Sequence, residues 1–111
     1  MNTELLKELC EARGVPGQEA GIRKIVRREF HQLTDEMRVD PMGNLYATFP
    51  GASDAKIMIA AHMDEIGFII KHIDDKGFLR LQSLGGFDPR QLFAQRVLVS
   101  QVNGDISPGV L

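Results

Sequence analysis

Hydrophobic side chains recur at helical spacing in the first third of the chain and predict two helices. The first covers residues 3–13, and the second runs from about residue 18 to residue 33 with apolar positions at steps of three and four. Asn2 or Thr3 can cap the start of the first helix, and Gly14 is placed to end it. The apolar positions are Leu5, Leu6, Leu9, Cys10 and Ala12 in the first helix and Ile22, Ile25, Val26, Phe30 and Leu33 in the second.

Short apolar runs bounded by Gly, Pro, Asn and Asp predict strands after the helices. Residues 37–40 and 45–49 form a predicted hairpin around a turn at residues 41–44. Residues 57–61 contain no polar side chain, and such a run predicts a strand that is buried on both faces. Two helices, a hairpin and a central strand imply an α/β or α+β layered domain.

The pattern changes after Gly67. Further strands are predicted at residues 68–73, 78–84 and 96–102, and Asp105 could begin another after the hairpin signal Asn103-Gly104. Short strands between Gly and Asp turns are typical of a small β-barrel or sandwich. We therefore expect a boundary near residue 68, which divides the chain into residues 1–68 and 69–111. Both parts look unfinished as sheets, so the sequence predicts a fragment or a truncated product.

Composition narrows the function classes. The 111 residues are 43% hydrophobic and 25% charged with a net charge of −2, an ordinary globular composition for one small domain. No basic stripe suggests nucleic acid, and no apolar run reaches the roughly 20 residues that span a bilayer. Cys10 is the single cysteine, which fits a reducing cytoplasm, and its place on the apolar side of a predicted helix predicts burial.

The segment His62-Met63-Asp64 follows the apolar run directly and carries the candidate chemistry. In an extended backbone His62 and Asp64 point to the same side, because side chains repeat every two residues. Imidazole and carboxylate suit a divalent metal such as zinc, with one group binding the ion and the other setting the imidazole tautomer. The same residues also fit a polar strand end that precedes a turn at Gly67.

Four blocks in order resemble one enzyme family: residues 40–45, residues 61–68 (Ala-His-Met-Asp-Glu-Ile-Gly-Phe), Gly85-Gly86 and residues 95–97. They look like the N-terminal part of the dinuclear-metal aminopeptidases that build tetrahedral particles. That family includes glutamyl and deblocking aminopeptidases, and some members are labelled endoglucanase or cellulase. The opening of the chain, with Gly14-Val15-Pro16-Gly17, is similar to the family as well.

The resemblance implies a fold and a site. Residues 1–68 would be the N-terminal part of a zinc-peptidase-like α/β domain, and residues 69–111 the start of an inserted small β-barrel used for dimerisation. His62 would bind one of two divalent ions, zinc or cobalt, and Asp64 would orient His62. Glu65 does not match the family's general base. Full-length members act on peptides and form homo-oligomers from dimers.

The resemblance also has gaps. The other metal ligands and the general base of the family cannot be matched here, and residues 104–111 fit the family poorly. We therefore expect at most one weak metal site and little activity from this chain alone. Two alternatives are kept: a non-catalytic oligomerisation module, and a glycoside hydrolase. The second is disfavoured because neighbouring Asp64 and Glu65 would point to opposite faces rather than flank a sugar.

Overall fold

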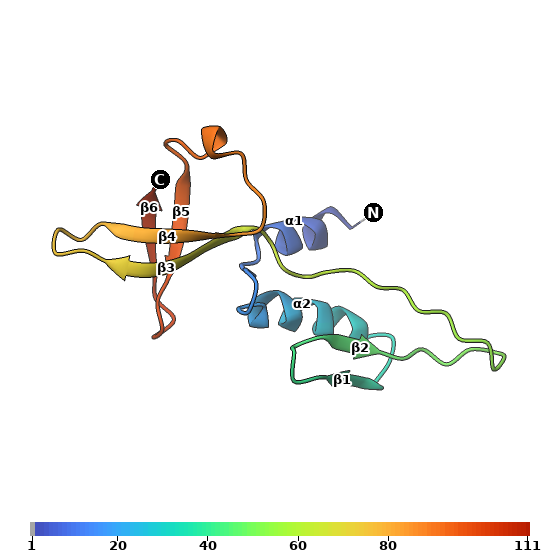
Figure 1. Cartoon of the computed structure of the whole chain (residues 1–111). Helices are drawn as coiled ribbons and strands as arrows, with labels where there is room; N and C mark the ends of the chain where they lie inside the picture. Colours follow the sequence, from blue (N-terminus) through green and yellow to red (C-terminus); the bar gives the residue numbers. More distant parts are fainter. Residues whose placement is uncertain (1) are drawn as a thin grey trace.

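Helices, β-hairpins and one long extended segment make up the structure, a computed structural model that describes residues 2–111. The elements are α1 (Thr3–Glu11), α2 (Ala20–His31), β1 (Met37–Val39), β2 (Leu45–Ala47), β3 (Gly67–Ile73), β4 (Leu79–Leu84), the short 3-10 helix η1 (Pro89–Gln91), β5 (Arg96–Ser100) and β6 (Ile106–Val110). Consecutive strands pair antiparallel, β1 with β2, β3 with β4 and β5 with β6. Both predicted helices and most predicted strands are confirmed, with their ends shifted by a few residues (Figure 1).

Helix α1 begins at a side-chain cap and ends without a glycine. The Asn2 carboxamide oxygen accepts the backbone N–H of Leu5 at 3.1 Å and so satisfies one of the free donors of the first turn. At the other end Ala12 already has an extended backbone. The prediction that Gly14 ends this helix is therefore wrong. Gly14 is buried, and its backbone serves a different contact that is described below.

Helix α2 packs against the β1–β2 hairpin and holds the small core of the molecule. Ile22 on α2 is only 6% exposed and is the one buried hydrophobic side chain among residues 2–111. At the other end of α2 the ring of Phe30 meets Phe49 just after β2. The Arg23 guanidinium donates to the backbone oxygen of Gly43 at 2.7 Å and ties the helix to the hairpin turn.

Asp40 organises that hairpin turn. Its carboxylate accepts the backbone N–H groups of Met42 and Asn44, the Asn44 side-chain amide and the Tyr46 hydroxyl, at 2.9 to 3.2 Å. These bonds, led by that of the Asn44 side chain, hold the pKa of Asp40 below its ordinary value of 3.8. The turn is therefore stabilised most when Asp40 is ionised.

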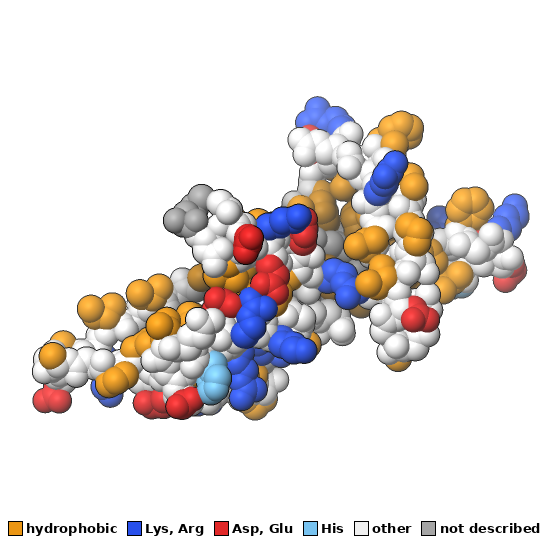
Figure 2. Space-filling view, turned by 180° about the vertical axis from the view of Figure 1, so that it is seen from behind, with side chains coloured by type: hydrophobic (Ala, Val, Ile, Leu, Met, Phe, Trp, Pro, Cys, Tyr) orange, Lys and Arg blue, Asp and Glu red, His pale blue; other side chains and the backbone are white. Residues whose placement is uncertain are grey.

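Residues 48–66, called the arm here, run out from β2 and back to β3 without helix or strand (Figure 1). The predicted buried strand at residues 57–61 is therefore wrong: Ile57, Met58 and Ile59 are 91%, 87% and 93% exposed. A strand needs a partner for its N–H and C=O groups, and the strands of residues 2–111 are paired among themselves. Figure 2 shows hydrophobic side chains gathered over this projecting end of the molecule.

The last four strands form two hairpins, β3–β4 and β5–β6, that remain separate two-stranded sheets within the described residues. In the first hairpin, Ile70 pairs with Leu81 and His72 pairs with Arg80, so the register shifts at Lys71. The barrel, and the division into residues 1–68 and 69–111, stay predictions. The observed class is a mixed structure of helices and antiparallel hairpins.

The molecule is elongated, and this leaves most side chains exposed. Its radius of gyration is 17.7 Å, against about 13 Å for a compact chain of 100 residues, and its extents are 61 by 30 by 24 Å. Cys10 is exposed, so the prediction of its burial is wrong. The apolar side of α1 has too little of the described chain against it, and no residue of α1 is buried. None of the helices within residues 2–111 is long and apolar enough to cross a membrane.

Candidate metal site

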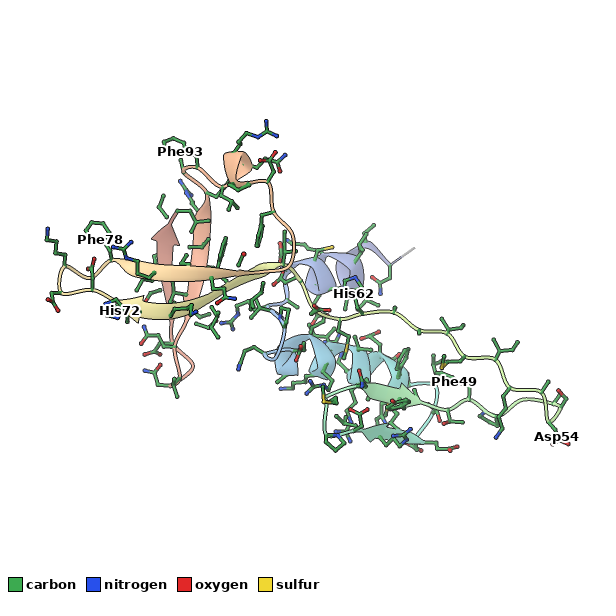
Figure 3. The ribbon with its side chains drawn as sticks, in the orientation of Figure 1. Phe49, Asp54, His62, His72, Phe78 and Phe93 are labelled. Carbon is green, nitrogen blue, oxygen red and sulfur yellow. The ribbon has the colours of Figure 1, made fainter. Side chains whose placement is uncertain are left out.

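His62 and Asp64 meet on the limb of the arm that returns to β3. The Nδ1 atom of His62 lies 2.9 Å from the backbone oxygen of Asp64 and 3.1 Å from its carboxylate Oδ1. Because both neighbours can only accept, Nδ1 must carry the ring proton and donate it. The lone pair of a neutral imidazole then lies on Nε2, the atom that a metal ion would bind. Figure 3 shows His62 between the tip of the arm, marked by Asp54, and the start of β3.

The pair forms only part of a metal site. The His62 side chain is 83% exposed and that of Asp64 is 40% exposed, so a metal ion would reach Nε2 without displacing protein. Within residues 2–111 no three His, Cys, Asp or Glu side chains gather into a group that could hold an ion. Catalytic zinc usually takes three protein ligands. The two residues therefore fit one ligand position of a metal site: a neutral imidazole as the ligand and a carboxylate that accepts its Nδ1–H.

Glu65 turns away from Asp64 and binds the loop between the helices. Its carboxylate Oε1 accepts the backbone N–H of Gly14 at 3.2 Å, and its own backbone N–H donates to the Gly14 oxygen at 2.8 Å. We call this reciprocal pair the Gly14–Glu65 clasp. The partners are 51 residues apart, and neither residue type signals the other, so sequence reasoning had no means of finding the contact. The predicted divergence of Asp64 and Glu65 agrees with these separate partners.

Two further polar residues, His72 and Asp88, lie outside this site. His72 is exposed on the β3–β4 hairpin, well away from His62 (Figure 3). Asp88 precedes η1 and accepts the backbone N–H and guanidinium of Arg90, and these bonds, led by that of the side chain, hold its pKa below 3.8. Both residues therefore belong to local hairpin and turn structure.

Comparison with known proteins places these features in a family. The model of the M42 glutamyl aminopeptidase family matches residues 43–111, and a model described as AMPT matches residues 2–25. The M42 match includes residues 104–111, so the expectation that this tail fits the family poorly is wrong. A lysyl aminopeptidase of Pyrococcus furiosus is 43% identical over 95 residues, which are 85% of this chain and 27% of that protein.

Solved structures agree. The chain is similar to a TET aminopeptidase of a marine sediment Thaumarchaeota archaeon, with a TM-score of 0.91, 34% identity, and coverage of 97% of this chain and 30% of that one. The TET1 peptidase of Pyrococcus horikoshii, which can assemble into a tetrahedron or a large octahedral shell, gives a TM-score of 0.83 and 38% identity over 97% of this chain and 32% of that one. A Thermotoga maritima structure named endoglucanase gives 0.77 and 37% over 82% of this chain and 30% of that one.

This chain thus spans about a third or less of the length of the proteins that it matches. The matched residues include the His62-Met63-Asp64 segment and extend to the last residue of the chain. The sequence resemblance to the tetrahedral aminopeptidases is therefore confirmed, including the endoglucanase label on one relative. On these grounds the chain belongs to the M42 glutamyl aminopeptidase family.

Proposed function

We propose that this chain supplies the first metal ligand of an aminopeptidase, an enzyme that hydrolyses N-terminal residues from peptides. Family membership supports the activity. The observation that carries the role of this chain is the Asp64–His62 contact, which places the proton on Nδ1 and leaves Nε2 for an ion. His62 is the ligand, and Asp64 fixes its tautomer and orientation.

The roles of the two residues follow from ordinary metal chemistry. A bound pair of divalent ions, zinc or cobalt, supplies Lewis acidity toward the scissile carbonyl and toward a water molecule. His62 would hold one ion through Nε2, and Asp64 would keep the ring from rotating away. With one imidazole ligand and no further donors grouped around it within residues 2–111, the chain alone is expected to bind metal weakly and to have little activity.

Homo-oligomer formation is the second part of the proposal. The TET1 relative assembles into closed shells, and a shallow apolar depression of about 450 Å³ lies along β5 and β6 of this chain. Leu98 and Val110 on its surface are 63% and 71% exposed. Apolar surface of this kind is typical of surfaces that become buried between subunits. The same apolar surface and the separate two-stranded sheets also fit the alternative, a non-catalytic oligomerisation module.

Glycoside hydrolysis finds little support beyond the name of one relative. That chemistry needs two carboxyl groups facing each other across a sugar. Here Asp64 is engaged with His62 and Glu65 with Gly14, so the two carboxylates have diverging partners. These two residues therefore do not form the facing pair that sugar hydrolysis needs, and the family match supports peptide hydrolysis.

Zinc and cobalt titrations followed by NMR of the imidazole nitrogens test the proposal. The Nε2 resonance of His62 is expected to move on adding Zn²⁺ or Co²⁺, and His62→Ala abolishes that response. His72→Ala, which removes another exposed imidazole, on the β3–β4 hairpin, is the matched control and keeps the response. A His62 ring that does not respond contradicts the proposal. Rapid hydrolysis of aminoacyl-p-nitroanilides by this chain alone contradicts its expected inactivity.

A further inference from the structure

The Gly14–Glu65 clasp joins the loop between the helices to the residue that directly follows Asp64. Two hydrogen bonds run in opposite directions between the same two residues, one to the Glu65 side chain and one from its backbone. Such a closed pair fixes both the position and the direction of the arm at this point. The clasp thus ties the part of the arm that leads into β3 to the loop between α1 and α2.

Close packing around the clasp leaves the two backbones little freedom. A Cβ on Gly14 would lie 2.8 Å from Cγ2 of Ile22, the buried residue of α2. A Cβ on Gly67 would collide with the side chain of Val15. Glycine at position 14 therefore lets the loop lie close to Ile22, and glycine at position 67 lets Val15 lie close to the start of β3. Through Gly14 the clasp connects the end of the arm to the best-packed part of the molecule.

Beyond Phe49, which packs against Phe30, the outgoing part of the arm has few contacts. Residues 50–62 are exposed throughout and carry no regular structure, whereas Met63 and Asp64 become half-buried as the chain reaches the clasp. His62 is placed by Asp64, through its backbone oxygen and its carboxylate. Asp64 is placed in turn by its covalent neighbour Glu65. The geometry of the imidazole thus depends on a chain of contacts that ends at Gly14.

We propose that Glu65 is a positioning residue for the metal ligand: by clasping Gly14 it holds Asp64, and through Asp64 it presents the His62 ring in a preformed orientation. The inference rests on the proposed role of His62 as a ligand. Its physical basis is preorganisation, because a ligand that is already oriented loses less conformational freedom when an ion binds. The role requires a side chain at residue 65 that is as long as glutamate and ends in an oxygen acceptor. The negative charge of that side chain is secondary.

Three substitutions separate reach from charge. Glu65→Gln removes the charge but keeps an oxygen that can accept from the Gly14 N–H. Glu65→Ala removes both, and Glu65→Asp keeps the charge on a side chain one methylene too short. Glu36→Ala, in an exposed turn before β1, is the matched control for loss of a carboxylate. Circular dichroism of each variant establishes that α1 and α2 are retained.

Two readouts are measured on the 111-residue chain. Without metal, the ¹⁵N shift of the His62 Nδ1 atom reports its proton, and hydrogen exchange reports the Gly14 amide. With Zn²⁺, titration of the His62 resonance reports affinity. Glu65→Ala and Glu65→Asp are expected to speed Gly14 exchange, to move the Nδ1 shift toward tautomer averaging, and to weaken zinc binding on the order of tenfold. Glu65→Gln and Glu36→Ala stay close to the wild type.

The outcomes are distinct. Unchanged Nδ1 shift and zinc affinity in both Glu65→Ala and Glu65→Asp overturn the inference, as does a Glu65→Gln variant that loses as much as Glu65→Ala. If the His62 resonance of the wild type does not respond to zinc, the proposed ligand role is contradicted instead. The metal-free Nδ1 shifts of the wild type and the variants then test the clasp by themselves. If Glu65→Ala does not fold, the comparison of Glu65→Asp with Glu65→Gln gives the same decision.

Discussion

The rings of Phe30 on α2 and Phe49 after β2 meet edge to face, with centroids 5.9 Å apart and ring planes at 86°. This contact joins the end of α2 to the start of the arm. Such aromatic pairs contribute about 0.5–1.5 kcal/mol beyond the area they bury. A double-mutant cycle of Phe30→Leu and Phe49→Leu, measured by urea unfolding, is expected to give a coupling free energy in that range. Phe93→Leu, at an 86% exposed ring, serves as the control, and independent effects of Phe30 and Phe49 would contradict the prediction.

The backbone at Gly14 has no room for a methyl group, so Gly14→Ala is expected to lower the free energy of unfolding by about 1–3 kcal/mol. The added Cβ meets Ile22 at 2.8 Å and forces either α2 or the clasp to move. Gly86→Ala is the matched control, because no atom lies within 4 Å of its added Cβ. Urea unfolding followed by circular dichroism measures both variants. Equal free energies of unfolding for the two variants would show that the loop between α1 and α2 accommodates the methyl group without cost, against the prediction.

The β1–β2 turn is expected to lose stability in acid through Asp40. Hydrogen bonds led by that of Asn44 lower the pKa of Asp40 in the folded chain below 3.8. A carboxyl with a lowered folded pKa contributes its stability above the unfolded pKa and loses it as the pH falls through the folded value. The stability difference between wild type and Asp40→Ala should therefore be full at pH 7 and shrink below about pH 3.8.

Thermal unfolding between pH 2 and pH 7 measures that difference. Asn44→Ala removes the leading hydrogen-bond donor while keeping the carboxylate, so it should reduce the pH-dependent part. A difference between wild type and Asp40→Ala that persists unchanged at pH 2 would assign the effect to packing rather than to ionisation.

The exposed apolar part of the arm is expected to drive self-association. Ile57, Met58 and Ile59 are consecutive residues with almost fully exposed side chains. Exposed apolar side chains on a backbone without a partner strand favour β pairing between chains. Ile59→Lys should shift the chain toward monomer in sedimentation velocity and reduce binding of a hydrophobic dye. Val102→Lys, in the turn between β5 and β6 where the side chain is fully exposed, is the control and should change neither. Association that Ile59→Lys leaves unaltered points to another surface.

Local patterns predicted most of the secondary structure because each element here is specified by nearby residues. The stripe that contains Ile22 and Phe30 marks α2, and Asn2 marks the start of α1. The residue types Asn103-Gly104 predicted a turn, and Gly104 indeed has a φ of 91°, a conformation that favours glycine. The same holds for the side on which His62 and Asp64 lie, because two-residue spacing in an extended chain determines it.

Features that depend on distant partners were not predictable. Residues 57–61 have the composition of a buried strand, yet composition does not reveal whether a neighbouring strand is present to pair with them. Cys10 has the right helical phase for burial, but burial requires another element over that side of α1. The sequence indicates no structural role for Glu65, because its partner Gly14 lies 51 residues earlier in the chain.

The register shift at Lys71 determines which side chains share a face of the β3–β4 hairpin. In an uninterrupted strand Ile70 and Ile73 would point to opposite sides, because they are three residues apart. With Lys71 unopposed, Ile70 lies across from Leu81 and Ile73 across from Leu79, so all four reach the same face. Lys71 is therefore the extra residue that the bulge takes out of the alternation, and it has no partner on β4. Exchange of Lys71 for another residue is expected to be tolerated. Its deletion would leave a regular ladder in which Ile73 follows Ile70 by two residues, so Ile70 and Ile73 would still share one face of the hairpin.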